Sequence, residues 1–400
     1  MIMPKLRFRQ FSTSWEYKKL CEVGEIINGL TYSPADICDT GLLVLRSSNI
    51  QEGQLCLRDS VYVNLTVDEI KKTRENDILI CVRNGSRSLI GKNRIIIGLD
   101  KEATHGAFMA VFRGPLNRYV AQLLQTKKYY KQVYSDLGAT INSINGGNLK
   151  NYIFSFPSSC DETTKIADFL SSVDEKITLL NKQYDLLCQY KKGMIQKIFS
   201  QKLRFKDENG EEFPKWETCE LRKFLIPTLR EVKKPSENFL SVGIRSHFKG
   251  TFHKNDQDPN KVSVDKLFLV HEGDFILNIT FAWEGALAIA RKEDHLGYVS
   301  HRFPTYTFKK EVIVPKFFSY IYTLPKFLTY LDLCSPGGAG RNRVLKKSEF
   351  IEIKIDRPCM AEQTKIANIL STLDDKIAVK KAELDTLKTW KQGLLQQMFV

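Results

Sequence analysis

The chain has 400 residues, of which 42% are hydrophobic and 26% charged, a composition typical of a folded protein with room for two domains. Its 60 lysines and arginines outnumber 46 aspartates and glutamates, and the net charge of +14 favours a polyanionic partner such as nucleic acid, although any basic protein shares this property. No apolar run is long enough to span a bilayer, so we expect no membrane contact.

The first half of the chain, residues 1–160, is expected to form one globular domain. Its opening, MIMPKLRFRQF, is too short and too interrupted by charge for a signal peptide, which predicts a cytoplasmic protein. Short β-branched runs bounded by turn residues predict strands within 42–50, 76–85 and 94–100, and a helix is expected at 117–136.

Polar and basic residues gather in the loops between these runs. Arginine suits bidentate contact with guanine, asparagine suits adenine, and glycine lets the backbone approach a phosphate. The alternative interpretation is that these loops are ordinary solvated turns. The candidates for DNA contact in this half are Arg46, Arg83, Asn84, Ser86, Arg87, Lys92, Asn142 and Asn145.

Residues 161–200 predict one long helix. Apolar residues step alternately four and three positions, which is a heptad pattern and favours pairing with another helix. At about 1.5 Å per residue, the helix is on the order of 50 Å long. The stripe consists of Ile166, Leu170, Val173, Ile177, Leu180, Tyr184, Leu187, Met194 and Ile198.

Residues 201–360 are expected to form a second globular domain of similar design. Strands are predicted at 274–280 and 349–355, and a helix at 315–331. Its loops carry a different set of candidate DNA contacts, again with solvated turns as the alternative. These are Arg245, His247, Lys249, Trp283, Arg341, Asn342 and Arg343.

Residues 361–400 predict a second long helix with a matching stripe. Lys380 replaces an aliphatic residue in this copy, and Lys191 and Lys391 interrupt both stripes at the same place. The rest of the stripe consists of Ile366, Leu370, Leu373, Ile377, Leu384, Leu387, Leu394 and Met398.

The two halves are copies of one unit. Residues 162–199 align with 362–399 without a gap and are identical at 16 of 38 positions. KLRF occurs at 5–8 and again at 202–205, and a tryptophan follows each. A duplicated unit usually packs about a pseudo-twofold axis, so we expect antiparallel helices, with Met1 close to Val400.

Motifs of catalysis are missing from the sequence. No two prolines are adjacent, as an amino-group methyltransferase motif requires, and GSRSLIGKN at 85–93 lacks the P-loop spacing. The nine cysteines form no C-x-x-C pair, and the histidines are not at metal-ligand spacing. DEK at 174–176 and DDK at 374–376 resemble pieces of a nuclease triad, but on a heptad helix they indicate a charge cluster. We expect no catalytic residue, cofactor or metal in this chain.

The order of these parts resembles the specificity subunit of a type I restriction and modification system. The resemblance rests on IADFLSSVDEKI at 166–177, IANILSTLDDKI at 366–377 and the WExxxL openings at Trp15 and Trp216. It implies an α+β protein in which two mixed α/β target-recognition domains are joined by two long antiparallel coiled-coil helices. The boundaries would be 1–160, 161–200, 201–360 and 361–400.

The same resemblance implies a function and partners. Each recognition domain would read one part of a split, asymmetric sequence in double-stranded DNA, with the helices fixing the unread spacer. Two modification subunits would bind S-adenosylmethionine and methylate adenine, and restriction subunits would use ATP and magnesium to translocate and cleave DNA. The docking surface for the modification subunits would include Asp174, Lys176, Asp374 and Lys376.

Two other interpretations are open. The chain could be the recognition subunit of a fused restriction and modification enzyme, which an adjacent gene for a combined nuclease and methyltransferase would indicate. It could also be a coiled-coil scaffold whose globular ends bind protein. Lack of DNA binding by the assembled complex at any salt concentration would favour the scaffold.

Overall fold

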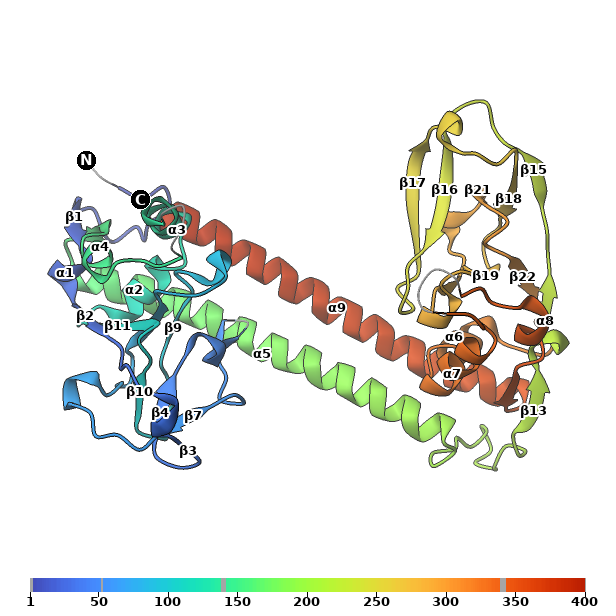
Figure 1. Ribbon diagram of the computed structural model, residues 1–400, viewed down its shortest axis with the longest axis horizontal. Coiled ribbons are helices and arrows are strands. Elements are labelled where there is room, and N and C mark those ends of the chain that lie inside the picture. Colours follow the sequence, from blue (N-terminus) through green and yellow to red (C-terminus); the bar gives the residue numbers. More distant parts are fainter. Residues whose placement is uncertain (1–2, 52, 138–141, 339–342, 400) are drawn as a thin grey trace. The chain divides into compact units, whose positions relative to one another are not determined.

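The computed structural model describes residues 3–51, 53–137, 142–338 and 343–399. Its contacts divide the chain into two compact units. Unit 1 comprises Met1–Tyr184 with Lys380–Val400, and unit 2 comprises Asp185–Val379. Each unit combines small sheets, short helices and parts of two long helices, which confirms the predicted α+β class (Figure 1). Because the units cut both long helices, the four expected domain boundaries stay a prediction.

Unit 1 is built around two four-stranded sheets. All their pairings are antiparallel except that of β10 with β4. The strands in order are β2 (Glu25–Asn28), β11 (Met109–Arg113), β8 (Ile78–Cys81) and β9 (Asn93–Ile95), then β10 (Ala103–His105), β4 (Leu42–Leu45), β7 (Val61–Val63) and β3 (Ile37–Cys38). Two-stranded ladders join β1 (Trp15–Lys19) to β12 (Ile153–Pro157) and β5 (Ile50–Gln51) to β6 (Gln54–Leu55).

The central strand β8 is buried on both faces. Ile78 and Ile80 belong to a cluster that includes the short helices and the long-helix ends, whereas Leu79 and Cys81 belong to the core shared with the second sheet. Successive side chains of a strand point to opposite faces, so a continuous apolar run is what a strand between two layers requires. The run ILIC in the sequence therefore marks the middle layer.

Unit 2 repeats this plan with a larger second sheet. Its first sheet has β14 (Leu225–Pro227), β22 (Thr305–Phe308), β19 (Phe275–Leu277) and β20 (Leu287–Ile289), and its second has β15 (Glu231–Lys233), β18 (Lys266–Val270), β21 (Gly297–Val299), β16 (Phe239–Ile244) and β17 (Thr251–Gln257). A ladder joins β13 (Glu217–Glu220) to β23 (Lys354–Arg357). The order β14-β22-β19-β20 matches β2-β11-β8-β9, and the parallel pair β16–β21 matches β4–β10.

The short helices depart from expectation in one respect. The stretches predicted as single helices are each broken in two, giving α2 (Asn117–Leu123) and α3 (Lys127–Asp136) in unit 1, and α6 (Pro315–Ile321) and α7 (Pro325–Leu333) in unit 2. Thr126 caps α3 by accepting a hydrogen bond from Tyr129 N at 3.3 Å, and Pro325 begins α7 because it lacks an N–H to donate to a preceding turn. Among the described residues, the other short α-helices are α1 (Leu20–Val23), α4 (Gly146–Lys150) and α8 (Lys347–Phe350), and several single 3-10 turns connect the strands.

The predicted strand at 349–355 is wrong in its first part. Phe350 ends α8, and β23 begins only at Lys354. Phe350 and Ile353 are both buried three residues apart, which is the spacing of a helical turn rather than of a strand.

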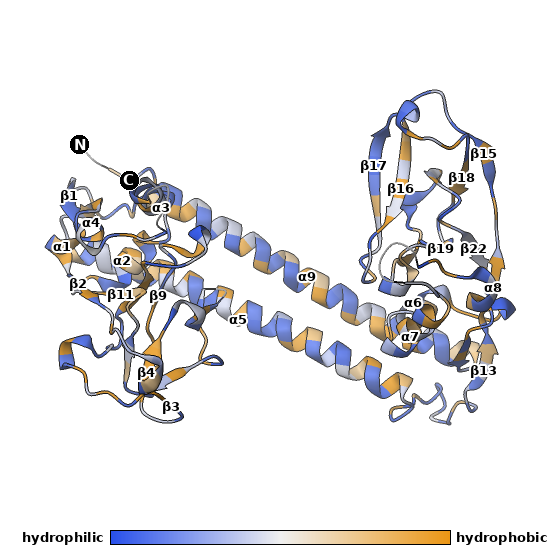
Figure 2. Cartoon of the chain, in the orientation of Figure 1, coloured by the Kyte–Doolittle hydropathy of each residue, from blue (hydrophilic) through white to orange (hydrophobic). Residues whose placement is uncertain are grey.

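The long helices are α5 (Cys160–Phe199) and α9 (Met360–Met398), about 60 Å each at 1.5 Å per residue. Hydrophobic and hydrophilic residues alternate along both (Figure 2). In unit 1 the beginning of α5 contacts the end of α9, and in unit 2 the beginning of α9 contacts the end of α5, so the helices are antiparallel as expected. Most of the buried stripe residues lie near the helix ends, and Leu180 and Leu384 are buried nearer the middle.

The two junctions between a KLRF segment and a long helix are built alike. Leu6 N donates to Gln397 O at 2.9 Å, and Leu203 N donates to Lys197 O at 3.1 Å. Gln397 and Lys197 occupy equivalent positions of the repeat. Met1 and Val400, which were expected to be close, lie outside the described residues.

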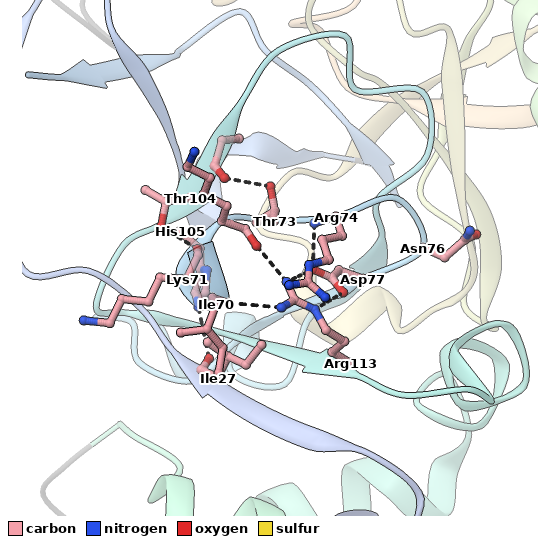
Figure 3. A network of polar contacts seen from close by, with 12 residues as sticks. Ile27, Ile70, Lys71, Thr73, Arg74, Asn76, Asp77, Thr104, His105 and Arg113 are labelled. Atoms are coloured by element: carbon pink, nitrogen blue, oxygen red, sulfur yellow. Dashed lines mark hydrogen bonds and ion pairs between the residues drawn. The ribbon is translucent and has the colours of Figure 1, made fainter. Parts of the chain in front are cut away.

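A polar network fastens the two sheets of unit 1 to each other (Figure 3). Arg113 on β11 donates to Asp77 at 2.7 and 2.9 Å and to the carbonyl oxygens of Ile70 and Lys72. His105 on β10 is 1% exposed, and its Nε2 lies 3.0 Å from Ile27 O on β2. These contacts hold the loop before β8 and so position the strand from which a candidate DNA-contacting loop emerges.

Candidate nucleic-acid interface

Three loops meet in unit 1 where β4 and β8 end. Asn84 Nδ2 donates to Ser47 Oγ at 3.0 Å, and Asn84 N donates to Asn142 O at 3.3 Å. Asn142 Nδ2 donates back to Gly85 O at 3.0 Å. The structure therefore brings together the loops that carry Arg46, Asn84 and Asn142, which are far apart in the sequence.

The charged residues of this cluster differ in how they are held. Arg83 is exposed and lies over the ring of Phe108, with 5.8 Å from Cζ to the ring centroid. Arg46 instead pairs with Asp59 at 3.0 Å. Ser86 and Arg87 are exposed on the same loop. The cluster thus presents one guanidinium that is paired with a carboxylate, on Arg46, and one whose described contact is an aromatic ring, on Arg83.

Two predicted contacts of this half have structural roles within the unit. Lys92 Nζ donates to the carbonyl of Ile50 and lines a separate cavity beside the long helices. Asn145 caps α4, its Oδ1 accepting from Gly147 N at 2.9 Å. Their role in DNA contact stays a prediction.

In unit 2 the cluster is formed by the hairpin between β16 and β17 and the turn after β19. Ser246 Oγ donates to Glu284 Oε2 at 2.8 Å, His247 N to Glu284 O at 2.7 Å, and Phe248 N to Gly285 O at 2.9 Å. His247 and Phe248 have φ of 60° and 57°, a left-handed conformation that these contacts stabilise. The predicted residues Arg245, His247 and Lys249 are exposed on this hairpin.

Trp283 and Arg343 form a stacked pair in the same unit. The guanidinium carbon of Arg343 lies 4.8 Å from the ring centroid of Trp283. Arg343 also donates to Asp332 Oδ1 at 2.6 Å and to Ser335 O at 3.1 Å, so most of its donors are used internally. Arg341 and Asn342 lie outside the described residues.

Sequence reasoning missed several residues that shape the clusters. Phe108 supports Arg83, Glu284 anchors the hairpin, and Arg302 donates to Thr280 Oγ1 at 3.1 Å. One local pattern does show that loops of the two units correspond. The dipeptide Arg-Ser follows β4 at 46–47 and follows the matching strand β16 at 245–246. Phe108 and Glu284 have no such signal, because their roles depend on contacts between distant loops.

The helix residues proposed for subunit docking divide into two kinds. Asp174 accepts from Lys391 Nζ at 2.5 Å and from Gln122 Nε2 at 2.7 Å, and Asp374 pairs with Lys191 and Tyr320. These aspartates therefore already join the long helices within their own units. Exposed positions on the same turns are held by Lys176 and Lys376.

Among residues 3–51, 53–137, 142–338 and 343–399, no group of histidine, cysteine, aspartate and glutamate is arranged to hold a metal ion. Within the same ranges, no helix is both long and apolar enough to cross a bilayer.

The comparison with known protein families finds the same domain in each copy of the repeat. A model of the type I restriction modification DNA specificity domain matches residues 13–188 and again 215–389. A Methanocaldococcus jannaschii chain, named as the specificity subunit of the type I restriction enzyme MjaX, is 26% identical over 98% of this chain and 94% of its own length. The EcoKI specificity subunit of Escherichia coli K12 is 27% identical, over 52% of this chain and 45% of its own.

Solved structures agree at the level of fold. The type I restriction-modification S subunit from M. genitalium superposes with a TM-score of 0.65 at 16% identity, covering 100% of this chain and 99% of that one. Because both matched segments together span most of the sequence, this chain belongs to the family of type I restriction modification DNA specificity proteins.

Proposed function

We propose that the chain is the DNA-recognition subunit of a type I restriction-modification complex and has no catalytic role of its own. Each unit would read one part of a bipartite, asymmetric site, and partner subunits would methylate adenine or cleave. The observation that carries this proposal is the pair of loop clusters, which occupy matching places on a duplicated scaffold but have different side chains. One scaffold with two surfaces suits the reading of two different short sequences.

The chemistry of both clusters suits duplex DNA. Arginine and asparagine side chains can read base edges in the major groove, while lysines and backbone N–H groups hold phosphates without regard to sequence. The net charge of +14 supplies the attraction to phosphate that makes such binding sensitive to salt. Catalysis would be left to the partners, which supply the reactive groups that this chain lacks among its sequence motifs.

We further propose the identity of these partners. Two methyltransferase subunits, carrying S-adenosylmethionine, would dock on the long helices, where Lys176 and Lys376 are exposed. Restriction subunits would supply ATP- and magnesium-dependent translocation and cleavage. The assembly would act in the cytoplasm, where chromosomal and invading DNA are both accessible.

The test is a map of N6-methyladenine. The chain would be expressed with its neighbouring methyltransferase subunit in a host without adenine methylation, and modified bases would be located across the genome by single-molecule sequencing. We expect one bipartite motif, methylated on both strands and absent when either subunit is omitted. A stable complex with an active methyltransferase and no motif that depends on this chain would contradict the proposal.

A further inference from the structure

We propose that Arg83 in unit 1 and Arg245 in unit 2 are the guanine-reading residues of the two recognition sites. The inference rests on the proposed function and adds to it an assignment of specificity. It predicts that each half of the recognised sequence contains a G·C base pair read by one identified arginine.

The first argument is how the arginines of the two clusters use their donors. Arg46 donates to Asp59, Arg302 to Thr280, and Arg343 to Asp332 and Ser335. Arg83, Arg87 and Arg245 are exposed, but among the described contacts only the guanidinium groups of Arg83 and Arg245 lie over the face of a phenylalanine. A ring face leaves the N–H edge of a guanidinium available, which is the part that bonds to guanine O6 and N7.

The second argument is the aromatic support itself. Arg83 lies over Phe108, which is 56% exposed, and Arg245 lies 5.5 Å from the ring centroid of Phe252. A cation is attracted to such a ring, so the side chain is held before DNA arrives. Phe252 in turn needs Gly243, because a Cβ there would lie 2.3 Å from the ring.

The third argument is the backbone beneath each arginine. Val82 N and Arg83 N both donate to Phe108 O, at 3.0 and 3.1 Å, and Ile144 N donates to Val82 O at 2.8 Å. Arg245 N donates to Gly250 O at 2.9 Å, which closes the hairpin. Less loop ordering is then required on binding, so more of the contact energy is available for discrimination.

The matched scaffolds explain why the two readers are not equivalent in sequence. Arg46 follows β4 and Arg245 follows β16, which are corresponding strands. The guanidinium of Arg46 is committed to Asp59, whereas Arg245 has no described acidic partner. Unit 1 uses the loop after β8 instead, where Arg83 lies. A reader taken from a different loop in each unit would place its guanine at a different step of each half, which suits an asymmetric site.

The experiment maps adenine methylation with Arg83→Ala and Arg245→Ala in the full complex. We expect each variant to relax one G·C position, Arg83→Ala in one half and Arg245→Ala in the other, with discrimination falling about 10- to 100-fold. Lys127→Ala and Lys223→Ala remove exposed charges outside the clusters in units 1 and 2 and should leave the motif unchanged.

Several outcomes would overturn the assignment. They are a wild-type motif with no G·C pair in one half, relaxation at an A·T pair, both variants affecting the same half, or an unchanged motif. If an alanine variant abolishes methylation, the methylation motifs of Arg83→Lys and Arg245→Lys are mapped instead. Lysine keeps the positive charge but cannot donate the two parallel hydrogen bonds by which a guanidinium binds guanine. A lysine variant that retains the wild-type motif would then refute the proposal. Failure of the proposed function is distinct, because the wild-type chain would direct no motif.

Discussion

Lys391 on α9 donates to Asp174 on α5 at 2.5 Å within unit 1, and their counterparts 200 positions away, Lys191 and Asp374, form the same pair within unit 2. Each lysine interrupts the apolar stripe of its helix at the same position of the repeat. Burial lowers the pKa of Lys391, and the Asp174 carboxylate opposes that shift. A charge at a single seam position costs stability but penalises any shift in helix register, because the charge would then lose its partner.

Replacing Lys391 should destabilise the long-helix pairing of unit 1. Lys391 is only 5% exposed, so Lys391→Ala leaves the partly buried Asp174 carboxylate without its cation and should cost about 3 kcal/mol. Lys381→Ala serves as the control, because its pair with Asp385 is largely exposed and should contribute less than about 1 kcal/mol. The opening free energy of the last turns of α9, measured by amide hydrogen exchange, distinguishes them. Equal effects would show that the seam pair is dispensable.

The KLRF junctions make a second, separable prediction. Arg204 donates to Glu362 at 2.7 and 3.0 Å, while Trp216 Nε1 donates to the same carboxylate at 3.2 Å. The Glu362 side chain is 1% exposed, so Arg204→Ala should destabilise unit 2 by about 3 kcal/mol. Adding Glu362→Gln should recover part of the loss, because a neutral amide is less costly to bury.

Amide hydrogen exchange in unit 2, measured at increasing urea concentrations, reports this change; tryptophan emission would not, because the chain has four tryptophans. The matched variant in unit 1 is Arg7→Ala, which removes the equivalent pair with Glu162 and should leave hydrogen exchange in unit 2 unaltered. A double variant no more stable than Arg204→Ala would mean that the unpaired carboxylate is not the source of the loss.

The sequence predicted the parts of the molecule that depend on local pattern or on the repeat. The heptads of α5 and α9 follow from the spacing of apolar residues, their antiparallel pairing follows from the duplication, and the strand ILIC of β8 follows from its continuous apolar run. The sequence analysis predicted 117–136 and 315–331 as single helices and missed the breaks at Thr126 and Pro325. Both residues are ordinary helix starts, but each stands within a long run of residues that suit a helix.

The candidate interface was predictable only as a set of loops. Residue type alone marks four arginines as equal candidates for DNA contact, namely Arg46, Arg83, Arg245 and Arg343. Whether the N–H groups of each guanidinium are already bonded depends on partners such as Asp59 and Asp332. Those partners come from other loops or helices, and no local pattern in a single sequence reports such pairings. The structure therefore adds which arginines are committed to the fold and which face outward.

Unit 1 should lose stability in mild acid through His105. Burial lowers the pKa of His105 from 6.5 to about 4, a shift that its hydrogen bond to Ile27 O and the Asp77 carboxylate oppose, while Arg113 and Lys71 add to it (Figure 3). Between about pH 6.5 and pH 4, His105 is protonated in the unfolded chain but stays neutral in the folded chain. The contribution of His105 to the free energy of unfolding is therefore complete above about pH 6.5 and is lost as the pH falls toward 4. The loss amounts to about 3 kcal/mol.

The measurement is amide hydrogen exchange of β8 and β11 between pH 7 and pH 4, with intrinsic exchange rates corrected for pH. His105→Gln keeps a donor for Ile27 O but does not titrate in this range, so its stability should vary less with pH than that of the wild type. Parallel profiles for the two proteins would show that His105 does not control acid sensitivity.

The hairpin of unit 2 depends on the absence of a side chain at Gly285. This residue has a φ of +76°, and a Cβ would lie 2.8 Å from the ring of Phe248, which packs beside Tyr322. Gly285→Ala should therefore displace the hairpin that carries Arg245 and reduce discrimination in one half of the recognised site.

Gly210→Ala is the matched control, because Gly210 has a similar φ of +83° but open space around it. Both variants share the cost of a left-handed alanine, about 1 kcal/mol, so a difference in the methylation motif reports the ring contact alone. If both variants methylate the wild-type motif with equal fidelity, the hairpin is not held by Gly285 and Phe248.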